Sequence, residues 1–304
     1  MNRIDFTNCK IDPLKMYGGA NGNKIGILYQ DTAYMLKFPP KKGKPDKMQY
    51  INSCISEYIA CSIFSSLQME VQETLLGTYQ NKSVVACKDF ETEGFLFKEF
   101  AALKNTVIIS EQNGYGTELE DILLTIDQQQ LLPPARIKRF FWEMFIGDTL
   151  LGNFDRHNGN WGFLINAKKG EVKLAPIFDC GSCLYPQADE AVQKKILSDV
   201  EEMDQRIYAF PNSAIYHAGA KINYFQFLSE TDNAECLEAL RDISERIDMK
   251  VIEQIIYSTP YISEVSKEFI STMVRERKNK IMHYALKHNL NMSNIRPVIR
   301  SKKR

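Results

Sequence analysis

Apolar residues in the first third of the chain recur with two different spacings. Two apolar runs within residues 24–38 flank a short polar segment, and the runs at 71–79 and 82–90 flank another. Short apolar runs joined by polar turns predict pairs of antiparallel strands. Between them, residues 48–67 carry isoleucine or leucine at every fourth position, which predicts a helix with one buried face. We therefore expect this part of the chain to form a small sheet packed against one helix.

Helical periodicity dominates the rest of the chain. A long amphipathic helix is predicted over residues 135–151, because apolar side chains recur on one face and two prolines precede it. Residues 161–165 and 172–178 predict two short strands around a turn, and the sequence from residue 191 onward has a mostly helical pattern. The change from strand-rich to helix-rich patterning predicts an α+β protein.

The polar segment Glu91–Gly94 lies where the pattern changes, and it predicts a boundary between two lobes. We expect a β-rich N-terminal lobe over residues 1–92 and a larger, mostly helical C-terminal lobe over residues 93–304. A chain of 304 residues is long enough to bury a sizeable core in such a bilobal arrangement.

Composition narrows the classes of protein without identifying a function. The chain has 38 basic and 38 acidic residues, so it lacks the overall charge of nucleic-acid-binding proteins, and we expect no direct nucleic-acid partner. Its N-terminus has no apolar signal core, and no window has the length of a membrane span. Seven cysteines lie mostly in apolar segments, as free thiols in a reducing compartment do. These features predict a cytoplasmic protein, with export that uses no cleaved signal as the alternative.

The strongest chemical signal is an Asp followed by an Asn five residues later and then by an Asp-x-Gly. Asp155 and Asn160 lie in the loop Asn-Phe-Asp-Arg-His-Asn-Gly-Asn, and Asp179 begins Asp-Cys-Gly. Phosphoryl transfer needs one carboxylate that orients a hydroxyl, and an amide oxygen and a second carboxylate that hold Mg²⁺. We expect Asp155 to be catalytic and Asn160 and Asp179 to be metal ligands. An ordinary polar turn is the alternative, but a hairpin ending at Asp179 would bring both ligands together.

Two residues near Asp155 are candidates for supporting roles. His157 could reach the metal, but Mg²⁺ prefers oxygen ligands, so we favour a structural or phosphate-contacting role for this histidine. Asp148 lies near the end of the predicted long helix. It either bonds the loop and fixes its shape or is a surface carboxylate, and the sequence does not separate these alternatives.

The N-terminal lobe supplies candidates for binding a nucleotide. Lys37 ends an apolar strand and could reach the α- and β-phosphates of ATP. Glu57 is the acidic residue in the middle of the helix predicted at 48–67, and burying it without a cation would be costly. An ion pair between Lys37 and Glu57 would satisfy both residues. An exposed glutamate on the margin of the helix is the alternative.

Further nucleotide contacts are predicted in a glycine-rich stretch and in the strand before the lobe boundary. Amides of a glycine-rich loop can approach phosphate oxygens, and the lysine that ends the stretch adds positive charge. The stretch is not a Walker A motif, because neither Ser nor Thr follows that lysine. The strand backbone could pair with the adenine edge. These contacts are Gly18, Gly19, Ala20, Asn21, Gly22, Asn23 and Lys24 in the stretch, and Cys87, Lys88, Asp89 and Phe90 in the strand.

Together these motifs resemble the HipA-like serine/threonine kinases over nearly the whole chain. The resemblance implies a bilobal kinase-like fold, ATP and Mg²⁺ as cofactors, and phosphate transfer to serine or threonine, often with autophosphorylation. It also implies Asp155 as the catalytic aspartate, Asn160 and Asp179 as metal ligands, and Lys37 with Glu57 as the lysine–glutamate pair. The segments that carry it are 18–24, 37–40, 56–60, 84–90, 150–163 and 175–186.

The resemblance also implies partners and leaves two other functions as alternatives. It implies a protein substrate with serine or threonine, the chain itself included, and an antitoxin protein as a partner. The loop around Asp155 is similar to that of lipid kinases, so a kinase for lipids or small molecules is one alternative. A nucleotide-binding effector without catalysis is the other, and the intact Asp155, Asn160 and Asp179 argue against it.

Overall fold

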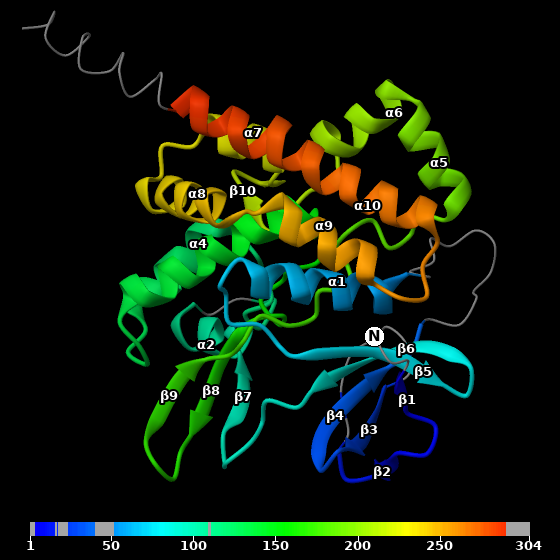
Figure 1. Ribbon diagram of the computed structural model, residues 1–304. Helices are drawn as coiled ribbons and strands as arrows, with labels where there is room; N and C mark the ends of the chain where they lie inside the picture. The colour runs from blue at the N-terminus through cyan, green and yellow to red at the C-terminus, as the bar shows by residue number, and fades with distance from the viewer. Residues whose placement is uncertain (1–3, 16, 18–23, 40–51, 109–110, 290–304) are drawn as a thin grey trace, which may run out of the picture.

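Two β-sheets lie side by side along one edge of the molecule, and most of the helices form a layer beside them (Figure 1). The computed structural model describes residues 4–15, 17, 24–39, 52–108 and 111–289. A strand-rich N-terminal part and a larger, helix-rich C-terminal part are both evident. The predicted α+β, bilobal fold class is therefore confirmed.

The N-terminal sheet consists of Ile4–Asp5 (β1), Lys10–Asp12 (β2), Lys24–Tyr29 (β3), Thr32–Lys37 (β4), Thr74–Tyr79 (β5) and Lys82–Lys88 (β6). Its strand order is β1-β5-β6-β4-β3-β2. The pairing of β1 with β5 is parallel, and the other pairings are antiparallel. The hairpin predicted within residues 24–38 is β3–β4, and the apolar runs after it form β5 and β6.

Two-residue turns with left-handed backbone close both hairpins of this sheet. Gln30 and Asp31 join β3 to β4 with φ angles of 48° and 60°, and Gln80 and Asn81 join β5 to β6 with φ angles of 48° and 62°. Two consecutive residues with positive φ give the turn whose twist matches that of paired strands. The turns fix the register, which places Lys37 at the end of β4 in the middle of the sheet.

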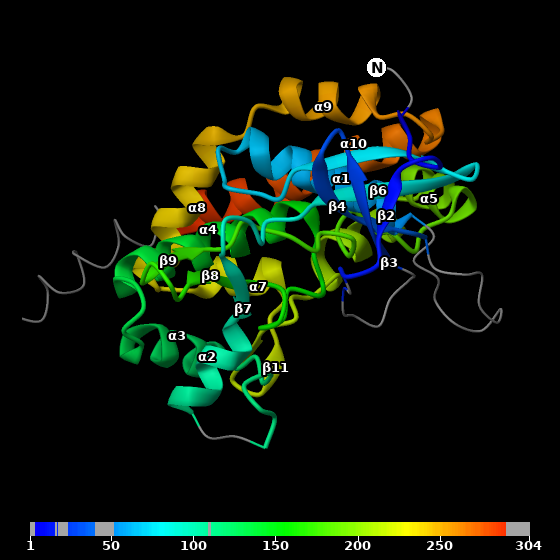
Figure 2. The same ribbon diagram turned by 90° about the horizontal axis from the view of Figure 1, so that it is seen from below.

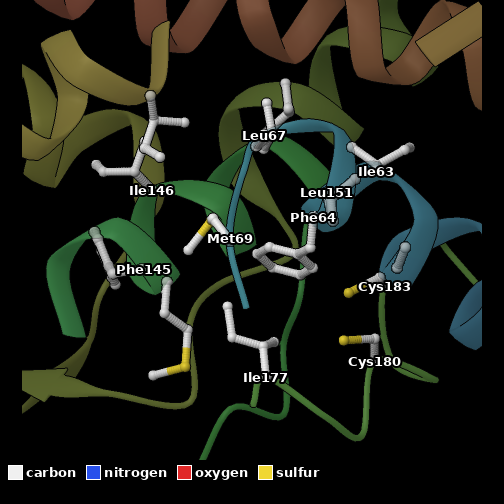
Figure 3. Packing of buried hydrophobic residues seen from close by; sticks show 14 of the residues in the cluster. Ile63, Phe64, Leu67, Met69, Phe145, Ile146, Leu151, Ile177, Cys180 and Cys183 are labelled. Carbon is white, nitrogen blue, oxygen red and sulfur yellow. The ribbon is translucent and has the colours of Figure 1, made fainter. Parts of the chain in front are cut away.

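Helix α1 (Ser53–Ser66) packs both against β5 and β6 of the N-terminal sheet and against helices of the C-terminal part. Figure 3 shows Phe64 of α1 in one apolar cluster with Phe145 of helix α4 (Pro134–Leu151). The contact is close: a Cβ atom added to Gly147 of α4 would lie 2.3 Å from the Phe64 ring. Of the helix predicted at 48–67, residues 48–51 lie outside the described ranges. Because α1 is part of the main core, its position relative to α4 is fixed by packing.

The second sheet consists of Leu96–Glu99 (β7), Gly162–Asn166 (β8) and Glu171–Leu174 (β9) in that order. Strand β9 ends four residues before the predicted strand end at residue 178. Beyond β9 the chain runs to the edge of the N-terminal lobe, where the Ile177 carbonyl accepts a hydrogen bond of 2.8 Å from the Gln72 amide. The expectation that the hairpin itself ends at Asp179 was therefore wrong, because pairing with the N-terminal lobe replaces pairing within the hairpin.

The remaining helices complete the C-terminal part. Helices α2 and α3, at Phe100–Val107 and Leu119–Gln128, extend away from the six-stranded sheet (Figure 2). None of the helices in the described ranges combines the length and the apolar character of a membrane span. The others are α5 (Glu190–Ser198), α6 (Val200–Asp204), α7 (Tyr224–Glu230), α8 (Ala234–Arg246), α9 (Met249–Ser258) and α10 (Glu264–Arg277), with π-helical segments at Gln205–Ala209 and Lys278–His283 and a small hairpin of β10 (Tyr216–His217) and β11 (Ala220–Lys221).

Candidate active site

A cleft of about 720 Å³ lies between the N-terminal sheet and the loops on either side of the β8–β9 hairpin. One wall comes from β3, β4 and the start of α1, and the other comes from residues 155–160 and 178–182. Nine residues that the sequence singled out line this one cleft. They are Lys24, Lys37, Glu57, Asp89, Phe90, Asp155, His157, Asn160 and Asp179.

The loop that carries Asp155 begins where α4 ends. Gly152, with a φ of 65°, ends the helix in the left-handed conformation that glycine adopts without strain. The Asp155 amide donates a hydrogen bond of 3.0 Å to Asn153 Oδ1. The Tyr224 hydroxyl donates one of 2.5 Å to the Asn153 carbonyl. Asn153 and Tyr224 are both buried, so the backbone next to Asp155 is held on two sides.

A buried ion pair lies beneath the loop. Arg156 Nε lies 3.0 Å from Asp148 Oδ2, and Arg156 Nη2 lies 3.2 Å from Asp148 Oδ1. Both side chains are only 2% exposed. Asp148 Oδ1 also accepts a hydrogen bond of 2.8 Å from the Asn153 amide group. Of the two alternatives for Asp148, the one in which it fixes the loop is correct.

Arg156 also joins the loop to the segment that carries Asp179. Its Nη1 donates to the Asn160 carbonyl at 3.2 Å and, in a short contact, to the Phe178 carbonyl. Asn160 and Asp179 therefore both line the cleft, as expected, but for a different reason from the one predicted. One buried guanidinium holds the two backbone segments together, where the sequence suggested the ends of a hairpin.

Lys37 lies between two carboxylates. Its Nζ is 3.0 Å from Glu57 Oε2 and 2.8 Å from Asp179 Oδ1. Burial opposes the charge on Lys37, but the two carboxylates raise its pKa well above the ordinary value. Lys37 in turn lowers the pKa of Asp179 to about 2, against the effect of burial. The expected Lys37–Glu57 ion pair is present, and Glu57 is buried, so it is not an exposed residue of the helix margin.

The environment of Asp155 makes its carboxylate a stronger base than an exposed aspartate. Burial raises the pKa of Asp155, Asp179 acts in the same direction, and His157 acts in the opposite one. A carboxyl whose pKa lies above the ordinary value of 3.8 accepts a proton more readily than an exposed one. His157 lines the cleft, and its Nδ1 accepts a hydrogen bond of 3.0 Å from the Gly159 amide.

The oxygen atoms at the cleft fit Mg²⁺. Asn160 Nδ2 donates to the Asp155 carbonyl at 2.8 Å, and within the described ranges its amide oxygen accepts no hydrogen bond. Asp179 has a left-handed φ of 55°, and 40% of its side chain is exposed. An amide oxygen and a carboxylate suit Mg²⁺, which completes its coordination with water and substrate phosphates.

Part of the predicted phosphate site can be located. Lys24 lines the cleft, whereas Gly18, Gly19, Ala20, Asn21, Gly22 and Asn23 lie outside the described residues. Burial lowers the pKa of Lys24, and the charge of Lys37 acts in the same direction. Two lysines that disfavour each other's charge suit a site for a polyanion, because a bound triphosphate would relieve their repulsion.

The residues predicted to contact the base lie only partly at the cleft. Asp89 and Phe90 line the cleft together with Glu91, but Cys87 and Lys88 do not. Cys87 is fully buried in β6, which pairs with a neighbouring strand on each edge. The Lys88 amide donates a hydrogen bond to the carbonyl of Glu73, directly before β5, and the Lys88 side chain forms an ion pair with the exposed carboxylate of Glu73. Cys87 and Lys88 therefore lie outside the lining of the cleft, and their contact with the base stays a prediction.

Sequence reasoning missed several residues of the cleft. Tyr17 donates to Asp89 Oδ2 at 3.1 Å, and Lys15 Nζ lies 2.6 Å from the same oxygen. Tyr17 stands directly before the glycine-rich stretch, so its position was a usable signal. Glu99 and Tyr115 also line the cleft, but each belongs to a segment whose own pattern gave no sign of a site.

Comparisons with known proteins agree with this geometry. The family model described as the HipA-like C-terminal domain matches residues 17–251. The serine/threonine-protein kinase CtkA of Helicobacter pylori strain J99 is 55% identical over 286 residues, which cover 94% of this chain and 88% of that protein. The crystal structure of a Helicobacter pylori proinflammatory kinase CtkA matches with a TM-score of 0.91 and 54% identity, over 96% of this chain and 99% of that one.

A more distant structure has the same fold. HipA of Shewanella oneidensis MR-1, solved with HipB and its operator DNA, matches with a TM-score of 0.57 over 91% of this chain and 69% of that one. At 12% identity this likeness concerns the fold alone. The family match, the similarity to CtkA and the kinase-like cleft lead to one conclusion: this chain belongs to the family of HipA-like kinases.

Proposed function

We propose that this chain is an ATP- and Mg²⁺-dependent kinase that phosphorylates serine or threonine in proteins. The observation that carries the proposal is the meeting of Asp155, Asn160 and Asp179 in one cleft with the Lys37–Glu57 pair. These are the groups that phosphoryl transfer requires. The 55% identity to a serine/threonine-protein kinase supports the acceptor class. We further propose residues 1–92 as the nucleotide-covering lobe and 93–304 as the lobe with the catalytic loop.

The acceptor hydroxyl is activated by Asp155 in this proposal. The Asp155 carboxylate orients the serine or threonine hydroxyl and accepts its proton as the oxygen attacks the γ-phosphorus of ATP. The bond from the γ-phosphorus to the bridging oxygen breaks, and ADP leaves with that electron pair. Because burial raises its pKa, Asp155 is a better proton acceptor than an exposed aspartate.

The phosphates are positioned by the residues of the opposite wall. Lys37 has three N–H donors, of which Glu57 and Asp179 engage two, so one is left for a phosphate oxygen. Lys24 adds positive charge on the same side of the cleft. Asn160 and Asp179 would hold Mg²⁺, which supplies charge neutralisation on the phosphates when bound.

Transfer of labelled phosphate from ATP tests this proposal. We expect Asp155→Asn and Asp179→Asn each to reduce transfer by at least about a hundredfold, because each removes an interaction made with the reacting groups. Asp232→Asn is the matched control, since Asp232 is exposed. Unfolding curves of Asp155→Asn and Asp232→Asn should overlap that of the unmodified chain, whereas Asp179→Asn should fold but unfold at lower denaturant, because it removes one carboxylate partner of Lys37. Wild-type transfer to added lipid or drug with none to protein would overturn the acceptor class, and an active Asp179→Asn would overturn the metal assignment.

Two finer expectations accompany this function. We propose that the chain works in a reducing compartment such as the cytoplasm, because its seven cysteines are free thiols and six of them are buried. An antitoxin partner rests on the family resemblance alone. Co-purification with a neighbouring gene product would test it, and a chain that purifies alone and stays active would argue against such control.

A further inference from the structure

Glu99 is a carboxylate at the cleft that has no role in the phosphate transfer proposed above. It is the last residue of β7 and the N-cap residue of α2, with φ and ψ of −64° and 150°. An N-cap side chain commonly accepts a hydrogen bond from the first turn of its helix. The Glu99 side chain makes no such bond and lines the cleft together with Asp155. Its orientation is therefore set by something other than helix capping.

Tyr115 and the catalytic loop surround the Glu99 carboxylate. The Tyr115 hydroxyl donates a short hydrogen bond to Glu99 Oε1. Glu99 Oε2 faces the catalytic loop: it lies 3.2 Å from the position that a Cβ atom on Gly159 would take, and His157 Nδ1 lies 3.1 Å from that position. Because Gly159 has no side chain, Oε2 stays open toward the cleft beside the loop that carries Asp155. Tyr115 holds one oxygen, and the other is available to a ligand.

Within the described ranges, Glu99 forms no ion pair with a lysine, arginine or histidine. Other glutamates at the cleft do: Glu57 pairs with Lys37, and Glu91 lies 3.9 Å from Lys15. The nearby ammonium of Lys104 is already held by Asp121 at 3.1 Å. The open oxygen of Glu99 can therefore accept a cation from a ligand. ATP does not supply that cation, because its phosphates would repel the carboxylate.

We propose that Glu99 binds the positively charged side chain of an arginine or lysine in the substrate, close to the serine or threonine that is phosphorylated. The inference rests on the proposed function. An extended peptide advances about 3.3 Å per residue, so a carboxylate beside the catalytic loop reaches a side chain within about three residues of the acceptor. Glu99 is thus a specificity-determining residue, and the preferred substrates are basic segments.

Peptide phosphorylation measures this preference directly. Serine peptides carry Arg, Gln or Glu at one position at a time, from three residues before the acceptor to three after it. For the unmodified chain we expect kcat/KM to be about tenfold higher with Arg than with Gln at one of these positions. In Glu99→Gln the Arg-to-Gln ratio should fall to about one, and in Glu99→Lys the Glu peptide should exceed the Arg peptide. Tyr115→Phe should lower the ratio partly, because it releases one carboxylate oxygen.

The controls separate this inference from the proposed function. Glu171→Gln removes an exposed carboxylate on β9 and should keep the tenfold Arg-to-Gln ratio. If the unmodified chain labels serine peptides without regard to charge, or if Glu99→Lys lowers all peptides by one common factor, the role of Glu99 is overturned and the kinase assignment stands. If no serine or threonine is labelled in any peptide or protein, the proposed function itself fails.

Discussion

The buried Asp148–Arg156 pair affects both the stability of the fold and the geometry of the site, and substitutions in the pair should change these two properties to different extents. The two side chains make two parallel hydrogen bonds of 3.0 and 3.2 Å, and each is 2% exposed. Burial raises the pKa of Asp148 although Arg156 acts against it, whereas Asp148 raises the pKa of Arg156 although burial acts against it. Removing one partner leaves a buried charge uncompensated, which costs about 3–5 kcal/mol.

A double-mutant cycle measures the coupling free energy between Asp148 and Arg156. We expect Asp148→Leu and Arg156→Met each to lower the free energy of unfolding by about 3–5 kcal/mol, because each leaves one buried charge. The double variant leaves none, so it should cost no more than either single variant. The coupling energy should therefore be about 3 kcal/mol. Guanidinium unfolding can be followed by the fluorescence of Trp142 and Trp161, which are both buried.

Activity should not recover together with stability. Arg156 also donates to the carbonyls of Asn160 and Phe178, and methionine offers neither bond. The double variant should fold and still transfer phosphate at least tenfold more slowly than the unmodified chain, because Asn160 and Asp179 are no longer tied together. Additive effects of the two single changes, within about 0.5 kcal/mol, would refute the coupling. Full activity in the double variant would refute the positioning role.

Three further predictions concern the cleft and its supporting loop. In His157→Gln the acidic limb of the pH profile of kcat/KM should move to higher pH, because the imidazole, which lowers the pKa of Asp155 when it carries a second proton, is gone; an unmoved limb would argue against Asp155 as the base. Lys37→Met should lower the free energy of unfolding by about 3 kcal/mol, because it leaves the buried Glu57 without its cation, and unchanged unfolding curves would contradict that reading. Gly152→Ala should lower the free energy of unfolding by about 1–2 kcal/mol, since the φ of Gly152 is 65° and a Cβ atom would lie 3.1 Å from a proline ring. An unchanged free energy of unfolding would contradict this prediction.

Local patterning was enough to locate most secondary structure. The hairpin at β3–β4, the strands β5 and β6, and the long helix α4 follow from apolar spacing, proline positions and turn residues, which act between residues a few positions apart. The end of β9 did not follow from it. The apolar run continues past Leu174, but the continuation pairs with the segment around Gln72, which is far away in sequence.

The same distinction applies to the site. Asp155, Asn160 and Asp179 were recognisable because the chemistry requires these residue types at short spacing, and the family match supports the kinase assignment. Cys87 and Lys88 do not line the cleft, and a sequence does not reveal which strand edges are already paired.

The amino-acid order sets which chemical groups this protein possesses and which short elements carry them. Long-range packing brings those groups together. It buries Arg156 so that one guanidinium joins two loops, and it packs α1 into the C-terminal core so that Glu57 faces Lys37. It also turns Glu99 from a helix cap into the cleft. The physical reason is that periodicity encodes contacts between near neighbours in the chain, whereas a cleft is lined by residues that only long-range packing brings together.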